Sequence, residues 1–209
     1  MDLFLQIANT LENGDDQTVS RLTNVALENG AEAGEILDQA LLAGMNVISE
    51  KFKAREIFLP DVLLAARAMN AGMELLKPFL TQSEQAGIGK IVIGTVKGDL
   101  HDIGKNLVGI MLKGAGFEVI DLGKDVAPRL FVETAVKEQA DVIGLSALLT
   151  TTMPVMKDVI ALLREKNQTD RIKVIVGGAP ASEDFAKEIG AQAYAFDAAS
   201  AVDRIKQLI

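Results

Sequence analysis

The spacing of apolar residues changes once along this 209-residue chain, and this change constrains the fold more than any other feature. As far as Pro78, apolar residues recur every three or four positions, as they do along the buried face of a helix. From Ile91 onward, short apolar runs alternate with further stretches of helical spacing. The polar segment 81–87 separates the two regions. We therefore predict two domains, residues 1–86 and residues 87–209.

The first domain is predicted to contain only helices. Breaks rich in Asn, Gly and Asp at 13–16 and 29–30 divide it into separate helices. The last helix opens at Pro60, because the fixed φ of proline suits a first helical turn, and it stops near Pro78. Four helices with short connections predict an antiparallel four-helix bundle.

The second domain is predicted to be α/β, because its apolar runs have the length and composition of parallel strands that are buried on both faces. These runs cover residues 91–94, 117–120, 142–145, 172–176 and 193–196. Helical patterns lie between them, so the strands belong to βαβ units with right-handed crossovers. We expect a doubly wound, flavodoxin-like or Rossmann-like sheet of five parallel strands in the order 2-1-3-4-5.

Composition excludes several classes of function. The net charge of −8 argues against nucleic acid as a partner, and the absence of Trp argues against base stacking. The chain has no Cys, which excludes disulfides and thiolate metal sites and fits a reducing compartment. Its first residues lack the basic lead of a secretory signal, and no apolar run approaches the length of a membrane span. We therefore expect a cytoplasmic protein without a membrane partner.

His101, the only histidine, follows the first predicted strand in the sequence Gly98-Asp99-Leu100-His101-Asp102-Ile103-Gly104. Open α/β sheets bind ligands at this carboxyl edge of their strands. Neutral imidazole is the commonest metal-binding side chain, and an acid two residues away can orient it. The loops after the third and fourth strands bring Ser146 and the pair Gly177-Gly178 to the same edge. Such small residues are common in turns, but three of these loops around one histidine indicate a slot lined by backbone.

Other motifs fit this region less well. The segment does not match a phosphate-binding loop, because five residues separate Gly98 from Gly104 where that motif has four, and Asn106 replaces its Ser or Thr. Neither a nicotinamide fingerprint nor a Gly-x-Ser-x-Gly elbow is present. Zinc is disfavoured by the single histidine and the lack of Cys.

The three loops together resemble a known signature. Asp99-x-His101-x-x-Gly104, then Ser146-x-Leu148, then Gly177-Gly178 is similar to the D-x-H-x-x-G…S-x-L…G-G signature of cobalamin-binding domains. Gly44-Met45-Asn46-Val47 and Phe58-Leu59-Pro60 look like parts of the helical cap domain of methionine synthase and of the small corrinoid proteins of methyltransferase systems. The two regions of resemblance cover nearly the whole chain.

The resemblance implies that cobalamin is bound with its tail base off the cobalt and inserted into a slot of the α/β domain. His101 would be the lower axial cobalt ligand, with Asp99 and Thr152 as a hydrogen-bonded relay behind it; methionine synthase has a serine at the position of Thr152. The other implied cofactor contacts are Gly98, Leu100, Asp102, Gly104, Ser146, Leu148, Thr150, Gly177, Gly178 and Ala198, with Phe58 from the cap. Of these, Ser146, Thr150 and the two glycines would line the slot.

The resemblance also implies a methyl carrier, the corrinoid component of a methyltransferase system and not a complete enzyme. Its cofactor would alternate between methylcob(III)alamin and cob(I)alamin. A substrate-specific methyltransferase would load it from a methylamine, methanol, betaine or an aryl ether, and a second methyltransferase would unload it to a thiol or folate. A reductive activation protein would complete the partners. The alternatives are a cobalamin-dependent sensor and the small subunit of an adenosylcobalamin mutase, which the helical module disfavours.

Overall fold

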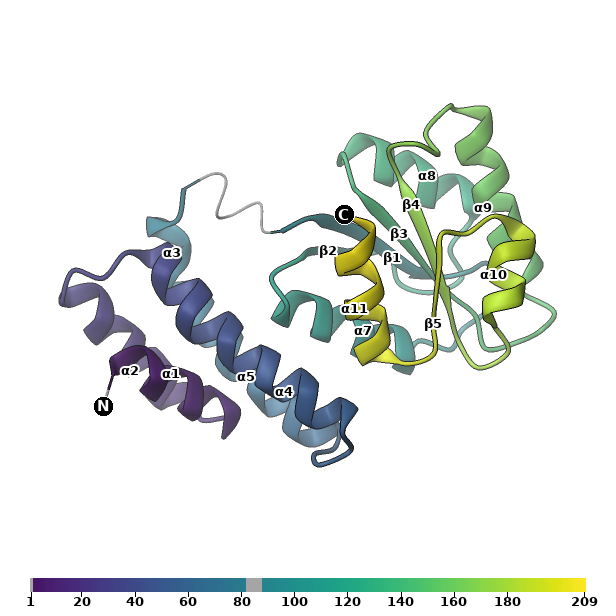
Figure 1. Ribbon diagram of the computed structural model, residues 1–209. Coiled ribbons are helices and arrows are strands. Elements are labelled where there is room, and N and C mark those ends of the chain that lie inside the picture. Colours follow the sequence, from purple (N-terminus) through teal and green to yellow (C-terminus); the bar gives the residue numbers. More distant parts are fainter. Residues whose placement is uncertain (1, 82–87) are drawn as a thin grey trace. The chain divides into compact units, whose positions relative to one another are not determined.

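The computed structural model describes residues 2–81 and 88–209, so most of the predicted polar segment 81–87 lies outside the described residues. The described chain forms a helical unit and an α/β unit, each with its own compact interior (Figure 1). The predicted fold class, an all-α bundle followed by a doubly wound α/β sheet, is confirmed. No helix in residues 2–81 and 88–209 is both long and apolar enough to cross a membrane.

The helical unit contains four helical segments, as predicted. They are α1 (Leu3–Glu12), α2 (Asp16–Glu28), a continuous run of α3 (Ala33–Ile36), η1 (Leu37–Leu42) and α4 (Ala43–Lys53), and finally α5 (Leu59–Leu76), which ends in the 3₁₀ turn η2 (Lys77–Phe79). The first two helices start at aspartates whose carboxylates accept backbone N–H groups, as N-caps do: Asp2 from Phe4 at 3.2 Å and Asp15 from Thr18 at 3.0 Å. Apolar spacing did not predict that η1 is π-helical.

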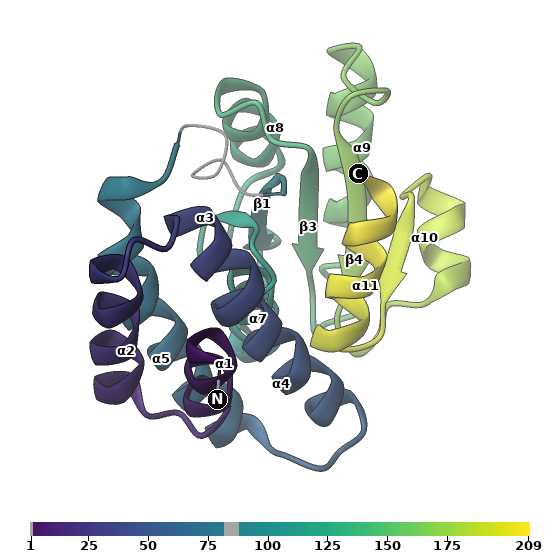
Figure 2. The ribbon, with the colours of Figure 1, turned by 60° about the vertical axis from the view of Figure 1, so that its left-hand side comes forward.

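The α/β unit is built on five parallel strands in the order β2-β1-β3-β4-β5, which confirms the predicted order. The strands are β1 (Lys90–Thr95), β2 (Glu118–Asp121), β3 (Val142–Ser146), β4 (Lys173–Gly177) and β5 (Ala193–Ala195). Helices α7 (Ile103–Gly114) and α11 (Ala198–Leu208) cover one face of the sheet. The other face carries α8 (Pro128–Lys137), α9 (Pro154–Glu165) and α10 (Glu183–Ile189) (Figure 2).

The register of the central strands brings their carboxyl ends together. Thr95 of β1 pairs with Ser146 of β3, and Ser146 pairs with Gly177 of β4. Loops that are far apart in sequence therefore start side by side at one edge of the sheet. The core beneath them is apolar and includes Val92, which is fully buried, as the continuous apolar strands predicted.

Candidate functional site

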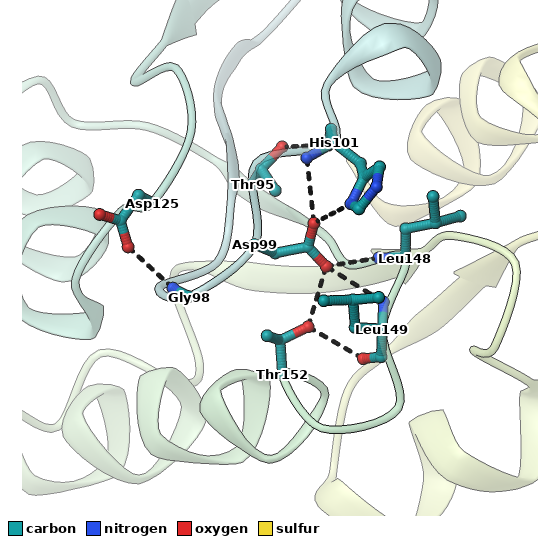
Figure 3. Close-up of polar contacts among 8 residues, drawn as sticks. All are labelled: Thr95, Gly98, Asp99, His101, Asp125, Leu148, Leu149 and Thr152. Atoms are coloured by element: carbon teal, nitrogen blue, oxygen red, sulfur yellow. Dashed lines mark hydrogen bonds and ion pairs between the residues drawn. The ribbon is translucent and has the colours of Figure 1, made fainter.

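Asp99 is the centre of the site, and it is completely buried. Its Oδ1 accepts the backbone N–H of His101 at 3.0 Å and contacts the ring Nδ1 of His101 at 2.8 Å (Figure 3). Its Oδ2 accepts the backbone N–H groups of Leu148 at 2.7 Å and Leu149 at 3.1 Å, and the hydroxyl of Thr152 at 2.9 Å. One carboxylate thus joins the loop after β1 to the loop after β3.

The ionisation of Asp99 determines the tautomer of His101. Burial by itself raises the pKa of the Asp99 carboxyl, because removing a charge from water is costly, but the hydrogen bonds from His101, Leu148 and Thr152 outweigh burial and hold this pKa well below its usual range. Asp99 is therefore a carboxylate, which only accepts hydrogen bonds. In the neutral imidazole, Nδ1 of His101 is then the donor to Asp99, and Nε2 keeps its lone pair for a ligand.

His101 is fixed at its backbone but accessible at its ring. Its carbonyl oxygen accepts the hydroxyl of the buried Thr95 at 3.0 Å, while its side chain is 51% exposed. The backbone N–H of Gly98, near the start of the same loop, donates to Oδ1 of Asp125 at 2.8 Å. Asp99 thus orients the imidazole through Nδ1, and the rest of the ring is accessible to a ligand.

A cavity of about 750 Å³ lies beside His101, within the size range of small-molecule sites. Its walls come from β1, β3, β4 and β5 and from α7 and α11. Most of the lining is apolar, including Ile93, Val108 and Ile205. Its charged or polar side chains are those of His101, Asp102, Lys105, Ser146 and Asp197.

The structure brings most of the predicted site residues together around this cavity. Those that line it are Leu100, His101, Asp102, Gly104, Ser146, Leu148, Gly177, Gly178 and Ala198. Asp99 and Thr152 lie behind the histidine, in the contact predicted for the relay. Gly98 lies in the same loop but does not line the cavity.

Thr150 differs from the expectation that it lines the slot: it is exposed and is not part of the cavity wall. The loop closes a turn through the hydrogen bond from Thr152 N–H to the carbonyl of Leu149 at 3.1 Å, and this turn points the hydroxyl of Thr152, not that of Thr150, toward Asp99.

Phe58 belongs to the helical unit, where it precedes α5 and its N–H donates to the carboxylate of Asp61 at 2.8 Å. Its side chain is 70% exposed, so it is not packed into the interior of the bundle. An exposed aromatic side chain fits the expectation of a cofactor contact, which stays a prediction.

Gly178 is required by the backbone, which the sequence did not reveal. Its φ is +112°, and a Cβ at this position would lie 1.9 Å from the carbonyl oxygen of Ala147. By contrast, a Cβ on Gly104 would meet nothing within 4 Å. Gly104 therefore faces open space at the cavity wall, whereas position 178 needs glycine for its backbone conformation.

Two parts of the site were missed by sequence reasoning. The first part is helix α11, which supplies Ala201 and Ile205 to the cavity wall. The four-residue spacing of these two residues is the sequence signal that could have predicted the helix. In the structure, Asp197 caps the helix by accepting the N–H of Ser200 at 2.8 Å. The second part is Lys105, whose side chain is only 3% exposed and forms an ion pair with Asp121.

The residues present fit a corrinoid cofactor. The described residues contain no cluster of three or more His, Cys, Asp or Glu side chains that could hold a bare metal ion, whereas one oriented imidazole suits a metal whose other positions a macrocycle fills. The largely apolar cavity of about 750 Å³ beside His101 fits the nucleotide tail of such a group. This fold and site define a cobalamin-binding protein.

Comparisons with known proteins agree with this class. Family models described as "B12 binding domain" match residues 89–206 and 3–77. The dimethylamine corrinoid protein of Methanosarcina barkeri is 44% identical over 100% of this chain and 98% of its own length, and dimethylamine corrinoid protein 1 of Methanosarcina acetivorans is 49% identical over 85% and 84%. A chain of the methanol:cobalamin methyltransferase complex of Methanosarcina barkeri superposes with a TM-score of 0.89 at 32% identity, over 99% of this chain and 79% of that one. This chain belongs to the B12-binding family of corrinoid proteins, whose cofactor is cobalamin.

Proposed function

We propose that this chain is a methyl-carrying corrinoid protein of a methyltransferase system, with His101 as the lower axial ligand of cobalt. The observation that carries the proposal is the contact at 2.8 Å between buried Asp99 and Nδ1 of His101, which leaves Nε2 available beside the cavity. The names of its relatives, which are dimethylamine corrinoid proteins, support the same role.

When bound, cobalamin supplies the organometallic chemistry, because its cobalt accepts and gives up a methyl group. The chain binds and orients this cofactor. Asp99 accepts the Nδ1 proton of His101 and so holds the ring in the tautomer that can ligate, as the outer partners of metal-bound histidines do. Thr152 holds the carboxylate from its other oxygen. Ser146, Leu148 and Ala198 line the slot for the displaced tail base.

The two domains divide this work in the proposal. Residues 87–209 hold cobalamin, and residues 1–86 shield the methyl-bearing face with Phe58. The partners are a methyltransferase specific for a small methylated compound of the methylamine or methanol type, and a second methyltransferase that acts on a thiol or folate. A reductive activation protein serves as a third partner. A structural relative that is part of a methanol:cobalamin methyltransferase complex supports the first partner.

Cobalt(II) electron paramagnetic resonance tests the ligand. We expect one axial nitrogen in the spectrum of the cobalamin-loaded protein, and a change in its hyperfine pattern when the protein is made with ¹⁵N-histidine. Because His101 is the only histidine, such a change assigns the ligand without ambiguity. An unchanged pattern on labelling would reject this ligand.

Methyl transfer is tested separately, by mixing the reduced, cobalamin-loaded protein with a methylamine- or methanol-specific methyltransferase and its substrate. The visible spectrum should convert to that of methylcobalamin, and a thiol-specific methyltransferase should reverse the conversion. A sensor or a mutase subunit would not be methylated under these conditions.

A further inference from the structure

Asp125 fastens the loop that carries His101, although it lies in a different part of the sequence. It belongs to the connection between β2 and α8, and its Oδ1 accepts the N–H of Gly98 at 2.8 Å (Figure 3). Its own backbone N–H donates to the carbonyl of Asp99 at 3.1 Å. One residue thus holds both Gly98 and Asp99, which lie near the start of the loop that carries His101, here called the histidine loop.

The hydrogen bonds described between Thr95, at the end of β1, and the connection that contains Asp125 come from the backbone alone. Thr95 N–H donates to the carbonyl of Gly123 at 2.9 Å, and Val126 N–H donates to the carbonyl of Thr95 at 3.0 Å. Among the contacts described between the two connections, the carboxylate of Asp125 is therefore the one that depends on side-chain identity. A change at this position can alter the histidine loop without changing the strand pairing below it.

The backbone of Asp125 supports a specific role. Its φ is +57°, in the left-handed region that costs a non-glycine residue energy and that Asp and Asn tolerate best. Residues held in this region persist where their surroundings fix them, and such positions cluster at ligand sites. Here the carboxylate and the N–H of Asp125 are both engaged with the histidine loop.

We propose that Asp125 is a positioning residue that acts on cobalt ligation through Gly98 and Asp99, a role that rests on the proposed function of His101. The carboxylate fixes the turn so that Asp99 can accept the backbone N–H and the ring Nδ1–H of His101 together. Without it, the turn samples other conformations and the imidazole is oriented for less of the time. The consequence is a weaker histidine–cobalt bond while cobalamin stays in the slot.

Three variants of the full chain separate the hydrogen bond from the backbone conformation. Asp125→Asn keeps an acceptor oxygen and the tolerance for positive φ. Asp125→Gly keeps only the tolerance, because it removes the acceptor. Lys124→Ala changes the exposed neighbour in the same connection and is the control. Thermal unfolding followed by circular dichroism verifies that each variant is folded before it is compared.

The first readout is the ratio of histidine-bound to histidine-free cobalt(II) in paramagnetic resonance spectra of the cobalamin-loaded protein. Loss of one charge-assisted hydrogen bond should lower this ratio about three- to tenfold in Asp125→Gly. The ratio should stay within about twofold of wild type in Asp125→Asn, because the acceptor oxygen is retained. Lys124→Ala should match wild type. If Asp125→Gly also matches wild type, or Asp125→Asn falls as far as Asp125→Gly, the positioning role is wrong.

The second readout needs no cofactor. The ring ¹⁵N signals of the single histidine report its tautomer in the cofactor-free protein, and Asp125→Gly should reduce the Nδ1–H population relative to wild type and to Asp125→Asn. An identical tautomer population in all variants would overturn the proposal. Absence of axial nitrogen in wild-type protein would instead reject cobalt ligation by His101, so the two failures are distinguishable.

Discussion

Asp99 has little tolerance for substitution, because five donors converge on its two oxygens in a buried position. In Asp99→Asn one oxygen becomes an amide NH₂ that faces either His101 or the donors of Leu148, Leu149 and Thr152. We expect the cofactor-free protein to lose about 1–3 kcal/mol of unfolding free energy, because buried donors are left unpaired. Urea unfolding measures this loss, with the exposed Asp158→Asn as control. Equal stability of the two variants would contradict the prediction.

A second prediction at the residue scale concerns Gly178. Gly178→Ala should destabilise the protein by about 1–3 kcal/mol from backbone strain alone, since its φ of +112° suits glycine and its Cβ would collide with Ala147. Urea unfolding of the cofactor-free protein tests this, with Gly104→Ala as the matched glycine variant. A Gly178→Ala protein as stable as Gly104→Ala would show that the backbone relaxes around the new methyl group.

The contacts of Asp99 with His101 and Thr152 could be predicted from sequence because the resemblance places both residues beside that carboxylate. The different positions of Thr150 and Thr152 could not, because they depend on a turn between Leu149 and Thr152. The reason why position 178 requires glycine could not be predicted from sequence either. A glycine that makes room for a ligand and one that avoids a carbonyl are the same letter in a sequence.

At the scale of elements, the five strands could be predicted because parallel strands buried on both faces are continuous apolar runs. The sequence predicts that Ala198 lies along a ligand slot, but it does not predict that helix α11 begins there. The π-helical stretch η1 could not be predicted, because its buried residues Leu37, Ala40 and Leu41 still recur at three- or four-residue spacing. An extra residue per turn alters hydrogen bonding without altering this pattern.

Helix α7 offers a clean test of the cavity. In Gly104→Leu the new side chain enters open space at the cavity wall, while the helix gains because Leu is favoured over Gly by about 0.5–1 kcal/mol. Cobalamin affinity should fall about tenfold or more, because the cavity is overfilled. Cobinamide, which lacks the nucleotide, should lose much less. Titrations followed by absorbance compare the two ligands in wild type, Gly104→Ala and Gly104→Leu. Equal losses for both ligands would place the tail elsewhere.

At the scale of the whole molecule, the proposal requires the helical domain to protect the cofactor between partners. We expect Phe58→Ala to retain cobalamin, because the slot of the α/β domain supplies most of the contacts, but to photolyse several-fold faster when loaded with methylcobalamin. Phe79→Ala is the matched control, since Phe79 is also exposed, at 65%, and lies in the same unit. If both variants photolyse at the wild-type rate, Phe58 does not shield the methyl group.

Because its strands are parallel, the sheet of the α/β unit has its candidate site at the carboxyl ends of the strands, and the edge at their amino ends can carry a label. The carboxyl ends of all five strands lie at the edge that carries His101. Helix α9 therefore runs from this edge to the opposite edge, where β4 begins. Lys166 lies there, exposed, directly after α9. Because the chain has no Cys, Lys166→Cys would create a unique thiol. A fluorophore on that thiol would lie at the edge opposite His101, so its anisotropy could be followed while a methyltransferase is added.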